Sequence, residues 1–375
     1  MRIAVNTRLL QPHQLKEYSH FTKNVFLKLA EQHQQHQFIF FFDRPFDQAL
    51  VLPRNVEPVV VNPKVQNILS FRWWFDVKIP VALKKYEADV FVSSDGFCSL
   101  TTNVPQVLVV DDLAFLYHPK FVPKHLLWFY KRCLAKFIQK AKVVCTVSEF
   151  SKQEIMRQYK VAEKKIQNTG SAANPIFKPI DSQERENIKE EFANGCEYFV
   201  FVGGIHPKDN LMNLLKAFSI FKKWQKTNMK LLVAGRSTPQ VNDTIEKLKT
   251  FKYRNEVKML GYLPEDTLAK VVAAAYAMVY PVFFEGFAVT IGEAMQCEVP
   301  VITSDKSSMR EIGGEAALYA DPSNTEEIAA QMKTIFKDEQ LRSKLIDLGK
   351  VQVQNFSWEK TAQLMWQSIQ HAVSK

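Results

Sequence analysis

The chain has 375 residues, a length that favours two domains over one or four. Hydrophobic residues make up 46% of it and charged residues 23%, which is close to the globular average and excludes disordered and collagen-like classes. The formal net charge of +10 predicts an anionic partner, either nucleic acid, a lipid surface or a phosphorylated small molecule.

The spacing of the cysteines and the lengths of the apolar runs indicate the cellular compartment of the chain. The five cysteines are widely spaced and include no CxxC pair, which indicates neither a disulfide framework nor a zinc site. Asn6, Thr7 and Arg8 interrupt the apolar region that a signal peptide needs. The longest apolar stretch, 271–284, contains Pro281 and is shorter than the ~20 residues of a spanning helix. We therefore expect a cytoplasmic chain with reduced thiols and no membrane-spanning segment.

The first half alternates short apolar runs with segments of helical periodicity. Helices are predicted at 21–30, 72–86, 123–140 and 149–159. Strands are predicted at 2–6, 38–42, 59–61, 90–93, 107–110 and 143–147, with a weaker one near Ile166. This alternation is typical of a parallel sheet that helices cover on both faces.

The second half repeats the alternation after a charged stretch at 181–191, where we place the domain boundary. The predicted domains are an N-terminal acceptor-side domain (1–182), a C-terminal donor domain (183–355) and a helix that packs back toward the N-terminal domain (356–375). Strands are predicted at 198–202, 231–234, 257–260, 277–280, 299–302 and 318–319, and the amphipathic helix at 358–373.

The expected fold is α/β, with two facing doubly wound, Rossmann-like domains. Such sheets bind ligands at the carboxyl ends of their strands, so two of them suit an enzyme with two substrates. Neither half has a GxGxxG turn after its first strand, and GxxxxGK[ST] does not occur. The sequence therefore lacks the motifs that would indicate a dinucleotide oxidoreductase or a P-loop nucleotidase.

The most informative stretch is 283–300, FFEGFAVTIGEAMQCEVP. Glu285 follows a predicted strand, and Glu293 lies about two turns into the helix that comes next. Free amides at the start of that helix, near 287–290, attract a phosphate, while carboxylates accept hydrogen bonds from sugar hydroxyls. One site can therefore bind a row of three groups, a phosphate at the helix amides with a sugar hydroxyl on either side of it at the two carboxylates.

With this motif the chain resembles the retaining glycosyltransferases of family 4, in which two glutamates are separated by seven residues. Further segments occur in the family's order, among them DDLAFLYHPKFVP, AKVVCTVSEFSKQEI, YFVFVGGIHPKDNLMNLLKAF and VPVITSDKSSMREIGGEAALYADP. The resemblance implies the two-domain GT-B fold, with the nucleotide sugar on the C-terminal domain and the acceptor on the N-terminal one.

The resemblance also implies roles for single residues. Glu285 would contact the transferred sugar, Glu293 the ribose hydroxyls, and Lys208 the diphosphate, with Asp111 as a second catalytic residue. The further residues expected at the donor are Gly203, Gly204, Arg236, Gly286, Phe287, Ala288 and Val289.

Several positions depart from the family pattern. Asp111 stands in place of a histidine, and Asp209 in place of a lysine that usually contacts the diphosphate. Thr290 replaces a proline. Glu17, Ser19 and His20 are the residues expected in the N-terminal acceptor loop, where Glu17 and Ser19 replace glycines that let the substrates approach. A catalytically impaired GT-B protein that binds a nucleotide, glycan or protein partner is therefore the alternative to a transferase.

Sugar transfer requires stabilisation of the leaving diphosphate, which helix amides and a cation can supply. A DxD pair, which metal-dependent transferases use, does not occur in the sequence. We therefore expect a retaining hexosyltransferase that needs no metal or other cofactor, with a UDP- or GDP-linked donor and a glycan or lipid-linked acceptor.

The net charge comes from the first half. Positions 1–182 hold 25 basic and 15 acidic residues, a difference of +10, whereas the remainder is neutral. The run 113–148 has seven basic residues, no acid and several aromatic residues, which allows it to lie on an anionic membrane surface. A core-packed helix with solvated lysines is the competing interpretation. Nucleic acid is not an expected partner, because no recognised binding module is present.

Overall fold

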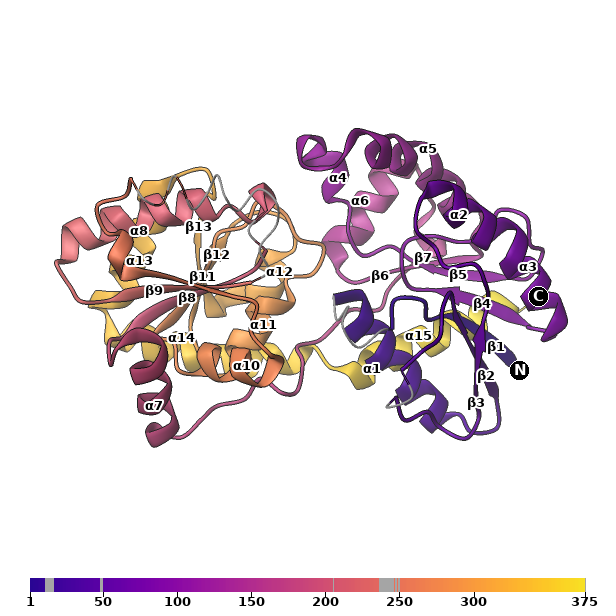
Figure 1. Cartoon of the computed structure of the whole chain (residues 1–375), viewed down its shortest axis with the longest axis horizontal. Coiled ribbons are helices and arrows are strands. Elements are labelled where there is room, and N and C mark those ends of the chain that lie inside the picture. Colours follow the sequence, from indigo (N-terminus) through magenta and orange to yellow (C-terminus); the bar gives the residue numbers. More distant parts are fainter. Residues whose placement is uncertain are drawn as a thin grey trace. The chain divides into compact units, whose positions relative to one another are not determined.

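The computed structural model describes residues 1–10, 17–47, 50–204, 206–235, 246, 248 and 250–374, with only the backbone of Glu17 and Tyr18 (Figure 1). The chain forms two compact units. Unit 1 consists of Met1–Ser171 together with Ser357–Lys375, and unit 2 consists of Ala172–Phe356. The chain therefore leaves unit 1 once and returns to it with its last helix.

In the described part of the chain, unit 1 is built on a parallel sheet of seven strands. These strands are β1 (Arg2–Asn6), β2 (Gln37–Phe42), β3 (Val56–Val60), β4 (Val90–Ser93), β5 (Gln106–Val109), β6 (Val143–Thr146) and β7 (Ile166–Asn168). Their order is β3-β2-β1-β4-β5-β6-β7, so Ile3 on the central strand pairs with Phe38 on one side and Val90 on the other. The strand interiors are almost wholly buried because helices cover both faces (Figure 1).

The helices of unit 1 are α1 (Glu17–Gln32), α2 (Ile68–Trp73), α3 (Ile79–Lys85), α4 (Ala114–Tyr117), α5 (Lys124–Lys140), α6 (Glu149–Tyr159) and α15 (Trp358–Val373). A π-helical turn, Trp74–Lys78, joins α2 to α3. The predicted helix at 72–86 begins earlier, at 68, because the Asn67 side chain accepts a hydrogen bond from the Ser70 amide and caps α2.

Helix α15 is part of the core of unit 1. It packs against α1 and against strands β4 to β7. The ring of Trp358 meets Phe21 of α1 edge-on at 6.2 Å, and Lys28 of α1 forms an ion pair with Glu359. The apolar face of α15, which includes Met365 and Ile369, is fully buried.

Unit 2 repeats this architecture over the described residues, with six parallel strands in the order β10-β9-β8-β11-β12-β13. The strands are β8 (Tyr198–Val202), β9 (Lys230–Ala234), β10 (Val257–Gly261), β11 (Ala277–Tyr280), β12 (Val301–Ser304) and β13 (Ala317–Ala320). The helices are α7 (Ser182–Ala193), α8 (Leu211–Gln225), α10 (Glu265–Ala273), α11 (Val289–Gln296), α12 (Met309–Gly313), α13 (Thr325–Lys337) and α14 (Glu339–Gln352). The expectation of two doubly wound parallel-sheet domains is confirmed.

The charged stretch at 181–191, where the sequence analysis places the domain boundary, forms helix α7 of unit 2. The Asp181 side chain caps this helix by accepting a hydrogen bond from the Glu184 amide at 2.8 Å. The two units divide earlier in the chain, between Ser171 and Ala172. Composition marks the stretch as polar because α7 is a surface helix with only one buried face.

Each sheet has a point at which successive crossovers run to opposite sides. In unit 1 this switch point lies between β1 and β4, and in unit 2 between β8 and β11. Open α/β sheets bind ligands outside the carboxyl ends of the strands at such points. The loops that follow these four strands are therefore the places to look for binding residues.

Among the helices described, none combines the length and the apolar character that a membrane crossing requires.

The packing of α15 gives a testable prediction. Replacing Met365, which is fully buried, with Ala leaves a cavity and should lower the free energy of unfolding of unit 1 by about 2–5 kcal/mol. Urea denaturation combined with amide hydrogen exchange checks this, with β4 to β6 losing protection and β8 to β12 keeping it. The control is Gln363→Ala on the exposed face of the same helix. An equal loss of protection in both units would contradict the assignment of α15 to unit 1.

Candidate active site

Lys208 and Glu285 meet at the switch point of unit 2. Lys208 lies in the turn after β8, and Glu285 lies in the loop after β11. The Lys208 Nζ is 3.3 Å from Glu285 Oε1, and the lysine side chain remains 30% exposed whereas the carboxylate is buried. Two residues 77 positions apart thus form an ion pair at the carboxyl edge of the sheet.

The Glu285 carboxylate and backbone are held from several sides. The Tyr280 hydroxyl, at the end of β11, lies 3.2 Å from Glu285 Oε1. The Glu285 amide donates to Ser307 Oγ at 3.1 Å, and Ser308 Oγ donates to the Glu285 carbonyl at 2.9 Å. Ser307 adopts a left-handed backbone with φ of 47°. Strained non-glycine residues of this kind concentrate at functional sites.

The turn that carries Lys208 is fixed to the loop that carries Glu285. The Phe283 amide donates to the Lys208 carbonyl at 3.2 Å. The buried amide of Asn210 donates to the carbonyls of Pro281 and Pro322 at 2.7 and 2.6 Å. The position of Lys208 near Glu285 is therefore set by backbone contacts as well as by the ion pair.

Asp209 is directed into its own turn. Its Oδ2 accepts a hydrogen bond from the His206 amide at 3.3 Å, while His206 Nδ1 accepts one from the Lys208 amide. Burial raises the pKa of the Asp209 carboxyl to about 6, against the opposing charge of Lys208. The acid that replaces the family's lysine therefore helps to cap a short 3-10 helix, and its Oδ1 lies 4.0 Å from Lys208 Nζ.

At this edge of the sheet, two glycines allow neighbouring atoms to lie close to the backbone. A Cβ on Gly204 would lie 2.9 Å from Asp209 Oδ2. Gly235, after β9, has a φ of 154°, and a Cβ there would lie 1.6 Å from the Gly203 carbonyl oxygen. Only glycine fits at Gly235 while β8 and β9 remain paired, because the backbone conformation and the space both exclude a side chain.

Helix α11 begins just beyond Glu285. Gly286, Phe287 and Ala288 are buried, and no side chain of the described residues caps the helix at Ala288. The first turn lies near the Glu285 loop, where the Val289 amide donates to the Phe287 carbonyl at 2.9 Å and the Ile291 amide to the Ala288 carbonyl at 3.0 Å. Half-buried Glu293 is the fifth residue of α11, and buried Thr290 takes the place of the family's proline.

The N-terminal candidates lie in unit 1. Asp111 follows β5 and is half-buried. Ser19 and His20 lie in the first turns of α1, and the Ser19 hydroxyl is buried without a hydrogen-bond partner among the described residues. Glu17 begins α1, and its side chain lies outside the described part of the structure. Arg236, a candidate in the C-terminal half, also lies outside the described residues.

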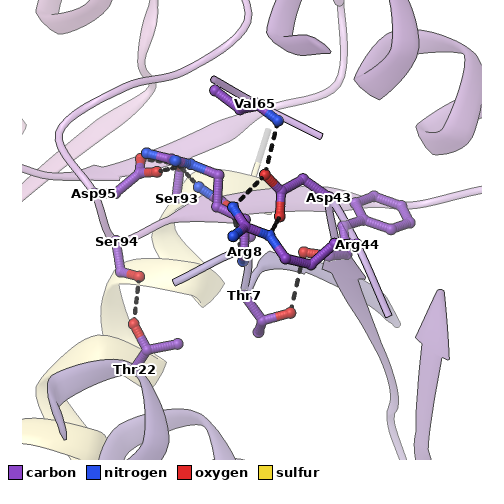
Figure 2. Close-up of polar contacts among 11 residues, drawn as sticks. Thr7, Arg8, Thr22, Asp43, Arg44, Val65, Ser93, Ser94 and Asp95 are labelled. Atoms are coloured by element: carbon purple, nitrogen blue, oxygen red, sulfur yellow. Dashed lines mark hydrogen bonds and ion pairs between the residues drawn. The ribbon is translucent and has the colours of Figure 1, made fainter. Parts of the chain in front are cut away.

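A second polar cluster, which the sequence analysis does not single out, lies at the switch point of unit 1 (Figure 2). Arg8 Nε donates to Asp95 Oδ2 at 2.7 Å, joining the loops after β1 and β4. Ser93 Oγ donates to Asp95 Oδ1 at 3.1 Å, and Asn6 donates to Ser93 Oγ at 3.0 Å. The Thr22 and Ser94 hydroxyls are 2.7 Å apart.

A neighbouring ion pair follows β2. Both oxygens of buried Asp43 accept hydrogen bonds from Arg44, at 2.8 and 2.9 Å, and Oδ2 also accepts one from the Val65 amide at 2.9 Å (Figure 2). This carboxylate ties two loops together.

Sequence reasoning missed Tyr280, Ser307 and Ser308 in unit 2 and the Arg8–Asp95 pair in unit 1. The available signal was their place at or beyond the carboxyl end of a predicted strand: Tyr280 is the last residue of one, and Arg8 and Asp95 each lie two residues after one. Ser307 and Ser308 lie in the loop after β12, where no such signal marks them. Within the described residues, no cluster of His, Cys, Asp and Glu has the arrangement of a metal site.

The chain has the two doubly wound parallel-sheet domains of the GT-B fold. Two family models match it, Glycosyltransferase Family 4 over residues 21–167 and Glycosyl transferases group 1 over residues 182–352. The chain belongs to this family of glycosyltransferases, as the resemblance in its sequence motifs implies.

Among curated proteins, the chain is 28% identical over 254 residues to O-antigen chain mannosyltransferase B of Escherichia coli, a match that covers 68% of this chain and 67% of the relative. Longer serotype-specific mannosyltransferases of Escherichia coli also match, and the matched region spans only 28–29% of their length.

Solved structures agree in fold. WaaG, a glycosyltransferase involved in lipopolysaccharide biosynthesis, superposes with a TM-score of 0.77 at 14% identity, covering 98% of this chain and 99% of WaaG. HepE of Anabaena, in complex with UDP-glucose, superposes with a TM-score of 0.75 at 15% identity, covering 99% of each chain.

The burial of Asp209 predicts a pH effect on stability. Because its folded-state pKa is raised, the folded protein binds this proton more tightly than the unfolded chain, and the contribution to stability is lost as pH rises from about 4 to about 6. Asp209→Asn should remove on the order of 2–3 kcal/mol of this dependence. Thermal unfolding of the wild type and of Asp209→Asn at pH 4 to 7 gives the difference between their free energies of unfolding at each pH. Parallel pH curves would contradict the prediction.

Proposed function

We propose that the chain transfers a hexose from a UDP- or GDP-linked sugar to a hydroxyl of a glycan or lipid-linked acceptor, with retention of the anomeric configuration. The observation that carries this proposal is the Lys208–Glu285 pair at the switch point of unit 2, in a chain of the glycosyltransferase family. The pair joins a cation suited to a diphosphate with a carboxylate suited to sugar hydroxyls.

In the proposed reaction, the bond between the anomeric carbon and the diphosphate oxygen breaks while the acceptor oxygen bonds to that carbon on the same face. The acceptor proton passes to the departing phosphate oxygen. Lys208 and the positive end of the α11 helix dipole stabilise the charge that develops on the diphosphate. This positive charge comes from the chain itself, so the proposed mechanism includes neither a metal nor another cofactor.

Glu285 and Glu293 divide the remaining donor contacts. Glu285 contacts the transferred sugar, and its ion pair with Lys208 holds both groups in position before the donor arrives. Glu293, one turn into α11, accepts hydrogen bonds from the ribose hydroxyls. The Tyr280 hydroxyl beside Glu285 is a positioning group for its carboxylate. In unit 1, Asp111 is the proposed second catalytic residue.

The relatives support the class of donor. The name of the Escherichia coli relative specifies mannosyl transfer to an O-antigen chain, and the HepE structure contains UDP-glucose. Both names specify a hexose, and in the HepE complex a nucleotide diphosphate carries it. The name of the curated relative supports mannose as the transferred sugar.

The alternative of a binding protein without catalysis rests on the acids that replace family residues. Asp209 weakens this alternative, because its carboxylate caps its own turn and has a raised pKa. Lys208 remains as a cation within reach of the donor position. These contacts favour a working transferase.

We also propose that unit 1 binds an anionic membrane surface from the cytoplasmic side through α5. This helix carries Lys124, Lys131, Arg132 and Lys136 on exposed positions, and its Trp128 is 60% exposed. The Arg132 guanidinium lies 5.4 Å from the centre of the Trp128 ring. An exposed tryptophan among basic side chains suits the interface between lipid headgroups and water.

Nucleotide binding tests the transferase proposal. Calorimetric titration should detect GDP or UDP binding, and Lys208→Met should weaken it by roughly 10- to 100-fold because a charged hydrogen bond to the diphosphate is lost. Glu285→Gln should retain nucleotide binding and lose about 10²–10³-fold in sugar transfer. Lys216→Met, on an exposed position of α8, is the matched control. If the wild type binds no UDP, GDP or sugar derivative of either at millimolar concentration, the transferase proposal fails.

Cosedimentation with lipid vesicles tests the membrane proposal. The chain should pellet with phosphatidylglycerol-containing vesicles and remain in solution with pure phosphatidylcholine. Replacing Lys131, Arg132 and Lys136 together with Glu should abolish pelleting, since each basic residue contributes about 1 kcal/mol near an anionic surface. Unchanged pelleting of the triple variant would count against this role of α5.

A further inference from the structure

The two units present the same arrangement at their switch points. In unit 2, Lys208 after the first strand meets Glu285 after the fourth strand, and in unit 1 Arg8 after the first strand meets Asp95 after the fourth. Both pairs lie where open α/β sheets bind ligands. The proposed function assigns the first pair to the donor and leaves the second pair without a ligand.

The Arg8–Asp95 pair is held rigidly. Asp95 is buried, and its Oδ1 accepts a hydrogen bond from Ser93, which in turn accepts one from Asn6 (Figure 2). The Arg8 guanidinium carbon lies 5.5 Å from the centre of the Phe71 ring, so one face of the cation is covered. Positioning of this kind lowers the entropy cost of binding a ligand.

The cluster retains unused hydrogen-bonding capacity. Over the described residues, Arg8 makes one side-chain hydrogen bond, through Nε, and its two terminal nitrogens make none. The Tyr130 hydroxyl of α5 also has no hydrogen-bond partner in that part of the chain. The Tyr130 ring stacks on Phe97 at 5.8 Å, and Phe97 packs at 4.5 Å against Phe71, the ring that the Arg8 guanidinium covers, so this phenol belongs to the same aromatic cluster as the pair. Burial, and then the negative charge of Asp95, raise the pKa of Tyr130. The buried Ser19 hydroxyl, one turn before Thr22 on α1, is unpartnered among the described residues as well.

The charge balance selects the kind of ligand. Arg8 and Asp95 cancel, and so do Arg44 and Asp43 beside them, so this edge of the sheet carries no excess positive charge for a phosphate. A neutral pair whose terminal N–H donors have no partner among the described residues instead suits hydroxyl groups, which accept from the guanidinium and donate to the carboxylate. The half-buried ring of Tyr130 adds apolar surface for a sugar ring.

We propose that Arg8, Asp95 and Tyr130 form the binding site for a neutral sugar unit of the acceptor, which they recognise through its hydroxyls. This inference rests on the proposed function for its place in the reaction. It concerns unit 1 alone and names residues that the donor proposal does not use.

The experiment measures saccharide and nucleotide binding separately on the full chain. Saturation-transfer NMR with methyl α-D-mannopyranoside and methyl α-D-glucopyranoside reports neutral sugars, and mannose 1-phosphate reports an anionic one. Calorimetry with GDP and UDP reports the donor site in unit 2. The variants are Asp95→Asn, Arg8→Lys and Tyr130→Phe, and thermal unfolding confirms that each is folded.

We expect at least one neutral glycoside to bind the wild type, and Asp95→Asn and Tyr130→Phe each to weaken it by about tenfold, or ~1.4 kcal/mol, with nucleotide binding unchanged. Arg2→Lys is the matched control, because Arg2 begins the same strand β1 at the opposite edge of the sheet. Should Asp95→Asn fail to fold, Tyr130→Phe carries the test, since it removes only a hydroxyl.

Binding of mannose 1-phosphate without any neutral glycoside would overturn the inference, and so would neutral binding that all three variants leave intact. Failure of both saccharide classes to bind the wild type would also overturn it. If the wild type binds no nucleotide but binds a neutral glycoside in a way that depends on Asp95, the transferase proposal is contradicted and the proposal for this site is supported.

Discussion

In each unit a buried carboxylate from the loop after the fourth strand faces a cation from the loop after the first. A buried carboxylate without a partner is costly, so each acid is stabilised at the sheet edge by its ion pair with the cation. The loops around the pairs are arranged accordingly. Ser307 and Ser308 hold the backbone of Glu285, and Ser93 and Asn6 hold Asp95. The parallel sheets determine where these contacts can form, because their switch points bring the two loops of each pair together.

The sequence predicted the fold well because strands buried on both faces read as continuous apolar runs. Even the three-residue strand β7 at Ile166 was anticipated. The charged segment 181–191 was interpreted as a boundary because its single buried face contributes few apolar residues to a helix that is otherwise polar. Only the packing of Ile188 and Ala193 shows that it belongs to unit 2.

The site was predictable to a different extent in the two units. Glu285 stood out because a second glutamate follows at a recognisable spacing, and Lys208 because it follows a strand and two glycines. Arg8 and Asp95 lie 87 positions apart and belong to no motif. Arg8 looked like a residue that merely breaks an apolar N-terminus. The direction of the Asp209 side chain also depends on three-dimensional structure, because a sequence shows an acid but not whether it faces a ligand or its own turn.

The charge of the chain separates into two regions of different character. The excess of +10 in positions 1–182 suggested an anionic ligand for that half. At the carboxyl edge of unit 1, however, two arginines are cancelled by two aspartates, whereas α5 carries exposed basic side chains. The net charge is therefore informative about the outer helices and uninformative about the sheet edge where a substrate would bind.

The return of α15 to unit 1 makes unit 2 an insertion within unit 1. During synthesis, all of unit 2 leaves the ribosome before residues 357–375, so unit 2 is complete while β4 to β7 still lack the helix that covers them. The N-terminal unit is thus the later of the two to reach its final packing. Its exposed apolar sheet face must be kept from aggregating until residues 357–375 have been made and have packed onto it, so this segment determines when unit 1 completes its core.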